Sequence, residues 1–166
     1  ITSTGAEINS AAQIKRTEFD VSPGTTSASI NFSADSNVYK YVFALSTLST
    51  SSGPNDLTLS VGRAGTDATW TGGYAYTTGT DGYLPTVADL WAGMTPYSQP
   101  NLVYLEINRT TDRWLANITQ THTTSGMFFV QAYASNINRD YLSNITLTTG
   151  SFYNLTVLQG HILEYS

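Results

Sequence analysis

Residues 141–166 read YLSNITLTTGSFYNLTVLQGHILEYS and carry a clear β-strand pattern. In the first half of this stretch, Ile145 and Leu147 alternate with polar residues, which is the period of a half-buried strand. Gly150 and Ser151 interrupt the pattern, and a second apolar series then runs to the last residues. The stretch therefore looks like two strands and a turn. Because chain ends fray unless they are paired, we expect the last strand to close a β-sheet whose other strands come earlier.

The same two-residue period recurs along the rest of the chain. Two segments, 38–48 and 127–134, are apolar on both faces, which is typical of strands in the middle of a sheet. Segments 102–107 and 114–119 flank a short turn and look like a hairpin. About ten short strands without a helix of ordinary length predict an all-β, antiparallel β-sandwich of the jelly-roll type. The expected strands before the last pair are 13–21, 28–32, 38–48, 57–61, 68–77, 102–107, 114–119 and 127–134.

The length and the order of these segments predict one domain. A chain of 166 residues is large enough to bury a substantial core. We expect a polar N-terminal arm at 1–12 and a single β-sandwich at 13–166. Within the sandwich, 78–100 contains three prolines and three glycines and is predicted to be a long loop, with a helical turn or two at 87–94. Loops of this length are usually functional or part of an interface.

The composition excludes several classes of function. Charged residues make up 11% of the chain, against roughly 25% in an average globular protein, and serine and threonine together exceed a quarter. A net charge of −5 with scattered cations argues against nucleic-acid binding. The absence of cysteine removes disulfides, thiol catalysis and thiolate-bound zinc. No stretch approaches the ~18 apolar residues of a membrane span. We therefore expect no nucleic-acid partner, no membrane and no cofactor.

The titratable residues form no recognisable catalytic motif. The two histidines, His122 and His161, have no nucleophile-elbow sequence to serve, so we interpret both as surface or edge residues. Asp67, Asp81 and Asp89 flank the predicted loop and are the one set that fits a glycosidase pair. The interpretation we favour is that these acids stabilise turns. A calcium site made of loop oxygens stays open as an alternative. The prediction is that the protein is not an enzyme, with no catalytic or metal-ligating residues.

An aromatic patch at 70–83, WTGGYAYTTGTDGY, is the most suggestive local feature. Aromatic rings between glycines suit stacking on sugars, and Tyr and Trp are also enriched at protein interfaces. The alternative is that these aromatics belong to the core or to a sheet edge, and Trp114 has the same ambiguity. The candidate ligand or subunit contacts are Trp70, Tyr74, Tyr76, Tyr83 and Trp91.

Five Asn-x-Ser/Thr triplets occur in the sequence. In a secreted eukaryotic protein such triplets mark glycosylated surface loops. Two of the five fall inside expected strands, and the abundance of serine and threonine makes chance matches expected. We therefore interpret the triplets as a consequence of composition. They begin at Asn31, Asn108, Asn117, Asn144 and Asn154.

Two parts of the sequence resemble a known group of proteins. The segment LSNITLTTGSF at 142–152, followed by a last apolar strand, looks like the closing hairpin of a group of tailed-bacteriophage virion proteins with a jelly-roll fold. Upstream, INFSADSNVYKYVFALSTL at 30–48 and LTLSVG at 57–62 are similar to the opening strands of that group. The chain departs from the group's pattern at 155–156, where Leu-Thr replaces a Gly-Ser pair, and in the ending, which lacks a Leu-Tyr-Gly sequence.

This resemblance implies a non-enzymatic structural role in a phage virion, which is assembled in the host cytoplasm. The expected roles are head decoration, cement, or a tail-fibre or knob module, with major capsid or tail proteins as partners. A homo-oligomer is expected, with a trimer favoured, since closed rings remove exposed sheet edges. An alternative function is a carbohydrate- or receptor-binding module of a tail fibre, whose partner would be a host-surface glycan. A glycan-cleaving enzyme is the least favoured hypothesis.

Overall fold

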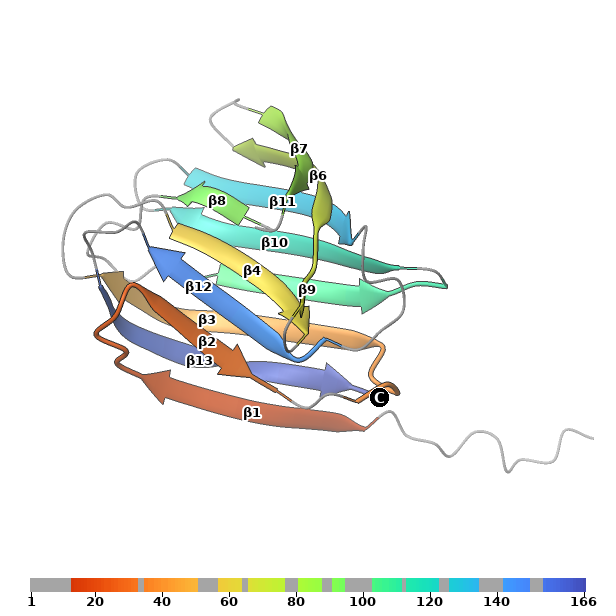
Figure 1. The fold of residues 1–166 in the computed structure, drawn as a ribbon, viewed down its shortest axis with the longest axis horizontal. Coiled ribbons are helices and arrows are strands. Elements are labelled where there is room, and N and C mark those ends of the chain that lie inside the picture. Colours follow the sequence, from red (N-terminus) through yellow and green to blue (C-terminus); the bar gives the residue numbers. More distant parts are fainter. Residues whose placement is uncertain are drawn as a thin grey trace, which may run out of the picture.

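The chain folds as an antiparallel β-sandwich, as predicted. The structure is a computed structural model, in which the described residues form thirteen strands and no helix (Figure 1). The predicted N-terminal arm at 1–12 lies outside the described residues. These residues are 13–32, 35–50, 57–63, 66–76, 81–87, 91–94, 103–111, 113–122, 126–134, 142–149 and 154–166.

Two sheets face each other, and all the strand pairs in them are antiparallel. The larger sheet has the order β1 (Ile14–Val21), β13 (Leu155–Tyr165), β3 (Lys40–Thr50), β9 (Val103–Arg109), β10 (Trp114–His122), β11 (Gly126–Ala134), β6 (Trp70–Tyr76) and β7 (Asp81–Val87). The smaller sheet has the order β2 (Ser27–Asn31), β12 (Asn144–Thr149), β4 (Leu57–Arg63) and β5 (Thr66–Asp67), and β8 (Trp91–Met94) also pairs with β4.

The strand pairing is that of a jelly roll with two insertions. The first strand pairs with the last, β1 with β13, and moving inward along the chain β2 pairs with β12, β3 with β9, and β4 with β8. Successive pairs alternate between the two sheets, so the chain winds as one long folded ribbon. Strands β5 to β7 are inserted between β4 and β8, and β10 and β11 between β9 and β12. The insertions meet where β6 pairs with β11, which widens the larger sheet beyond the jelly roll.

Several expectations about strands are confirmed. β9 and β10 form the predicted hairpin, and the terminal strand β13 closes the larger sheet between β1 and β3. The two segments that are apolar on both faces correspond to β3 and β11, and each lies between two neighbours in the larger sheet. The two-residue period therefore predicted these strands correctly, and apolar residues on both faces predicted their central position.

The predicted closing hairpin is wrong. β12 belongs to the smaller sheet and β13 to the larger sheet, so these consecutive strands are not paired. Each buries one apolar side: Ile145 and Leu147 of β12 lie in the core, as do Leu158 and Ile162 of β13. A core-facing side does not decide the pairing, because a strand can bury it from either sheet, and here β12 and β13 contribute to the core from opposite sheets.

The predicted long loop at 78–100 is also wrong, because β7 and β8 lie within it. A helical turn or two was expected at 87–94, but its last four residues, Trp91–Met94, form the strand β8. Pro85 argued against a strand, since proline has no N–H to donate. Within the described residues β7 is the last strand of the sheet and pairs with β6 alone, and the register of that pair is irregular near Pro85, so the missing N–H is tolerated.

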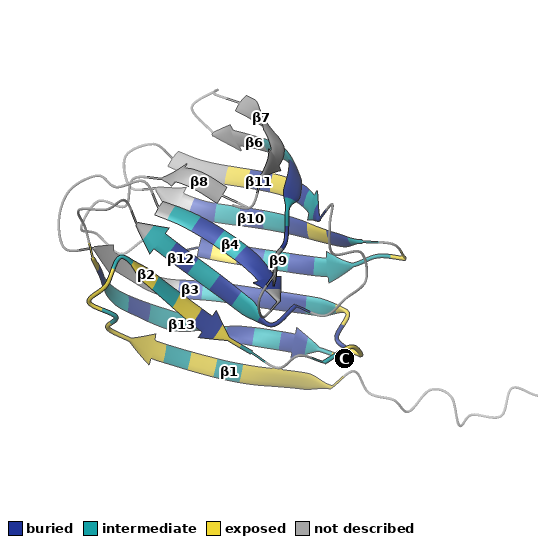
Figure 2. Ribbon diagram, viewed as in Figure 1, coloured by how far each residue is buried: buried dark blue, intermediate teal, exposed yellow. Residues whose placement is uncertain are grey.

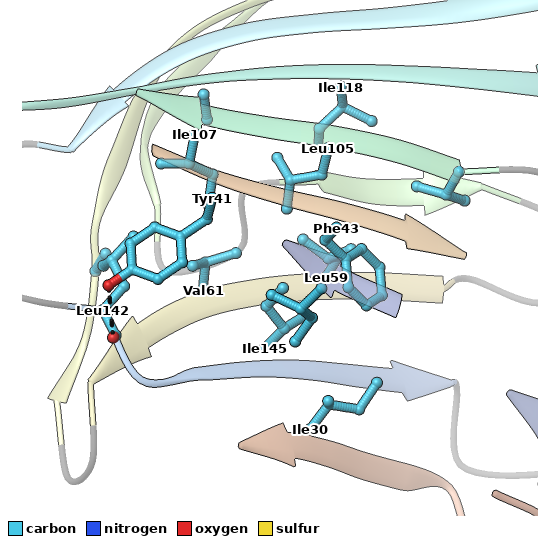
Figure 3. Packing of buried hydrophobic residues seen from close by; sticks show 14 of the residues in the cluster. Ile30, Tyr41, Phe43, Leu59, Val61, Leu105, Ile107, Ile118, Leu142 and Ile145 are labelled. Carbon is cyan, nitrogen blue, oxygen red and sulfur yellow. Dashed lines mark hydrogen bonds between the residues drawn. The ribbon is translucent and has the colours of Figure 1, made fainter. Parts of the chain in front are cut away.

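The core lies between the two sheets. Phe43 and Leu105 of the larger sheet face Leu59 and Ile145 of the smaller one (Figure 3). Tyr41, only 1% exposed, donates a hydrogen bond from its hydroxyl to the carbonyl oxygen of Leu142 at 3.2 Å. Burial raises the pKa of the Tyr41 hydroxyl, so this donor stays protonated. A buried hydroxyl with a fixed partner thus helps to hold the two sheets in register.

The edge strand β1 is mostly exposed (Figure 2). Its ring contact to the core is made by Phe19, which stacks on Phe43 with centroids 5.5 Å apart and planes at 9°. Lys15 adds an ion pair to the buried carboxylate of Glu164 in β13 at 3.1 Å. The charged side chains along this edge also discourage edge-to-edge aggregation.

Candidate functional site

The outer face of the larger sheet exposes large apolar side chains. Strand alternation turns Trp114, Ala116 and Ile118 of β10 into the core, so the intervening residues of β10 point outward. On the neighbouring strands Tyr104 and Phe129 are 45% and 39% exposed. Both are aligned with the same residue of β10, Thr119, so they lie in one row across three strands. We call Tyr104 and Phe129 the apolar row.

A hollow lies on the same face, over β6, β10 and β11. Its volume is about 250 Å³. Asn117 and Gln131 form a cross-strand pair inside it, and the residue of β6 aligned with Gln131 is Gly73. Because glycine has no side chain, the sheet surface is low at this point. The lining residues are Thr71, Gly72, Leu115, Ala116, Asn117, Gln131, Ala132 and Tyr133.

Gly72 explains why the floor of the hollow is backbone. A Cβ atom at this position would lie 1.9 Å from the carbonyl oxygen of Gln131, so only glycine permits β6 to approach β11 this closely. Tyr133, aligned with Thr71 of β6, also lines the hollow. The guanidinium of Arg113 lies 4.9 Å from the centroid of the Tyr133 ring, a cation–π contact that holds the ring in place.

Next to the hollow, Glu106 is the centre of a polar cluster. Lys40 Nζ lies 2.9 Å from Glu106 Oε2, Asn108 Nδ2 donates to Oε1 at 2.7 Å, and the Tyr104 hydroxyl donates to Oε2 at 3.4 Å. The hydrogen bonds from Asn108 and Lys40 lower the pKa of Glu106. The hydrogen bond to Glu106 raises the pKa of Lys40. Both groups are therefore charged around neutral pH, and the carboxylate oxygens are already engaged.

Replacing Glu106 by Gln is expected to lower the free energy of unfolding at pH 7 by about 0.5–1 kcal/mol. The lowered pKa means that folded Glu106 binds a proton less readily than unfolded Glu106. Its contribution is therefore present above the unfolded pKa of about 4.3 and is lost as the pH falls through the lower folded value. Urea unfolding from pH 7 to pH 2 should show the two curves converging in acid. Glu18→Gln, at a carboxylate with 73% side-chain exposure, is the control with a smaller effect; equal effects would contradict the assignment.

The structure corrects one predicted contact residue. Trp70 is 0% exposed, so it is a core residue and not a ligand or subunit contact. Its indole N–H donates to the carbonyl oxygen of Val61 in the smaller sheet at 3.4 Å. The alternative that assigned this aromatic to the core is confirmed for Trp70.

The other aromatic candidates are placed only by backbone. Tyr74 and Tyr76 lie in β6, Tyr83 lies in β7 and Trp91 lies in β8. Their side chains are outside the described part of the structure, so their roles stay predictions. By register Tyr83 is aligned with Gly73, the residue aligned with Gln131 of the hollow.

The backbone does not bring the candidate acids together. Asp67 lies in β5 before the start of β6, whereas Asp81 is aligned with Ala75 near the end of β6. At roughly 3.3 Å per residue, the five residues from Trp70 to Ala75 span about 16 Å, more than the ~10 Å limit of a glycosidase pair. Asp89 lies outside the described residues.

The histidines are also apart. His122 is the last residue of β10, and His161 is half-buried in β13, in keeping with a place on the sheet surface. Within the described residues, no three His, Asp or Glu side chains form a group able to hold a metal ion. The same part of the chain contains no helix that is long and apolar enough to cross a membrane.

Sequence reasoning missed the residues of the hollow. The alternation in β10 and β11 was a signal that Asn117, Gln131 and Tyr133 face outward, because their neighbours are apolar. The alignment of β11 with β6 was not visible, since these strands belong to two insertions far apart in the sequence. This pairing brings Thr71 and Gly72 of β6 beside β11, where they line the hollow together with residues of β10 and β11.

No protein-family model matches this chain, and searches among curated proteins and solved structures found no significant similarity.

Proposed function

We propose that this protein is a structural module of a tailed-bacteriophage particle that acts through contacts with other subunits and not through catalysis. The observation that carries the proposal is the jelly-roll pairing of first strand with last, second with second to last, and so on inward. Viral capsid proteins use this architecture, as do lectin domains and cupins. Fold alone is an analogy, so a second observation is needed.

The apolar row supplies that second observation. Tyr104 and Phe129 project from adjacent regions of a sheet face, and exposed aromatic residues are enriched where proteins associate. The antiparallel sheet is rigid, which lowers the entropic cost of ordering the contact. We infer a homo-oligomer, with a trimer favoured, whose subunits meet through the apolar row. Major capsid or tail proteins are the proposed partners in the virion.

Replacing Phe129 by Ser is expected to raise the subunit dissociation constant at least tenfold, and Tyr104→Ser should act in the same direction, because aromatic anchors dominate binding energy. Light scattering after size-exclusion chromatography, over a series of protein concentrations, measures this shift. The matched control is Tyr39→Ser, at a tyrosine that is equally exposed but lies outside the row. A wild-type protein that stays monomeric at the highest concentration would refute the assembly.

A further inference from the structure

We propose that the hollow over β6, β10 and β11 binds one unit of an uncharged, polyhydroxylated ligand, such as a neutral hexose in a glycan chain. This inference goes beyond the proposed assembly, which uses the apolar row. It also differs from the interpretation based on Trp70, because the hollow lies on the opposite face of β6.

Two carboxamide side chains supply polar groups to the lining of the hollow. The Asn117 and Gln131 side chains form a cross-strand pair and both line the hollow. Each carboxamide offers two N–H donors and one carbonyl acceptor. Neither side chain hydrogen-bonds to another group within the described part of the chain. Two adjacent carboxamides with spare donors and acceptors match vicinal hydroxyl groups, which also donate and accept.

The hollow also has an apolar lining and a small volume. Tyr133 and Leu115, a cross-strand pair, supply apolar side chains to the lining, and Gly72 and the buried Ala116 and Ala132 line it between them with little or no exposed side chain. An aromatic ring held against a low floor suits the C–H face of a sugar ring. The volume of about 250 Å³ is below the ~300–1,000 Å³ of pockets for drug-sized ligands. The hollow therefore has room for one unit of a longer ligand, with the rest of the chain outside.

The charged groups around the hollow bear on which ligand it can bind. Among the described residues that line the hollow there is no Asp, Glu, Lys, Arg or His. The nearest carboxylate by register is Glu106, aligned with Asn117, and its oxygens are engaged by Lys40, Asn108 and Tyr104. Arg113 is not a lining residue, and its guanidinium packs on the ring of Tyr133. A ligand with a full charge would find no counter-ion among the described lining residues, so a neutral ligand is favoured.

The hollow can be occupied while the subunits are assembled. Along β11, Gln131 is two residues from Phe129 of the apolar row, and along β10, Asn117 is two residues from Thr119, which is aligned with both members of the row. Two residues of a strand span roughly 7 Å. The hollow would therefore lie at the rim of a contact made by the apolar row, which is where a ligand from solvent has access.

Titration of the ¹⁵N-labelled full chain with maltotriose and with N,N′,N″-triacetylchitotriose, both uncharged, tests the proposal by NMR. We expect shift changes centred on 71–72, 115–117 and 131–133, with a Kd on the order of 1 mM because only a few hydrogen bonds are available. Asn117→Leu and Gln131→Met keep the side-chain size and remove the carboxamides, and each should weaken binding about tenfold. Asn31→Leu, at an exposed asparagine of the smaller sheet, should bind like the wild type.

Each outcome either supports or overturns the binding of a neutral sugar in the hollow. Shifts at the hollow whose fitted Kd rises about tenfold in both hollow variants and is unchanged in Asn31→Leu support it. The absence of shifts with either sugar at about 20 mM, shifts mapping elsewhere, or tighter binding of anionic trigalacturonate would overturn it. Light scattering on the same variants separates the two proposals. If Asn117→Leu and Gln131→Met change the oligomeric state and no sugar binds, the hollow belongs to a subunit contact and the ligand proposal fails.

Discussion

Replacing Trp70 by Ala is expected to lower the free energy of unfolding by about 3–5 kcal/mol, the usual cost of deleting a large buried aromatic side chain. Trp70 is 0% exposed and packs in the core at the start of β6. Its indole N–H donates to the carbonyl oxygen of Val61 at 3.4 Å, which joins an inserted strand of the larger sheet to β4 of the smaller sheet. The substitution therefore removes both core volume and a connection between the insertion and the jelly roll.

Two further variants make this prediction specific. Trp70→Phe keeps most of the apolar volume but loses the N–H donor, so it should cost less than Trp70→Ala. Asn31→Ala, at an exposed position of β2, should change the free energy of unfolding by less than about 0.5 kcal/mol. Urea unfolding followed by circular dichroism measures all three. A Trp70→Ala protein as stable as Asn31→Ala would show that Trp70 is not a core residue and would restore its assignment as a surface contact.

Local sequence patterns predicted the fold class and most of the strands correctly, but they predicted less well which strands pair. Apolar residues two apart in 38–48 and 127–134 identified β3 and β11 as strands, and their apolar faces on both sides placed them mid-sheet. These are properties of a single segment. The wrong hairpin at the C-terminus has another origin, because alternation states that β12 and β13 each bury one side but not in which sheet. Partner choice depends on long-range contacts that no short window contains.

The missed strand β7 has a comparable physical reason. Three prolines and three glycines in 78–100 are local evidence for a loop. An edge strand, however, needs hydrogen bonds on one side only, and Pro85 is compatible with that requirement. The sequence also left Trp70 as a candidate ligand or subunit contact beside the core alternative, because the core face and the outer face of β6 can be told apart only when its neighbouring strands are known.

Replacing Gly160 by Ala is expected to lower the free energy of unfolding by about 3 kcal/mol, a large effect for one methyl group. A Cβ atom at this position would lie 2.1 Å from the carbonyl oxygen of Ala44 in β3 and 2.7 Å from Cζ of Phe19 in β1. The register between β13 and β3 shifts between Gln159 and Gly160, so the bulge brings the two backbones close together here. The added methyl must push β13 away from β3.

Two comparisons separate this clash from other effects of removing a glycine. Gly24 has a φ of 63°, and a methyl group added there would have no atom within 4 Å, so Gly24→Ala should cost only about 1–2 kcal/mol for its left-handed backbone. Adding Phe19→Leu to Gly160→Ala removes the ring atom but leaves the Ala44 carbonyl in place, so it should restore little stability. Full recovery in the double variant would mean that the Phe19 ring, stacked on Phe43, and not the β3 backbone, sets the requirement for glycine.

Since β13 joins the edge strand β1 to the rest of the larger sheet, hydrogen exchange in β1 should rise first in Gly160→Ala.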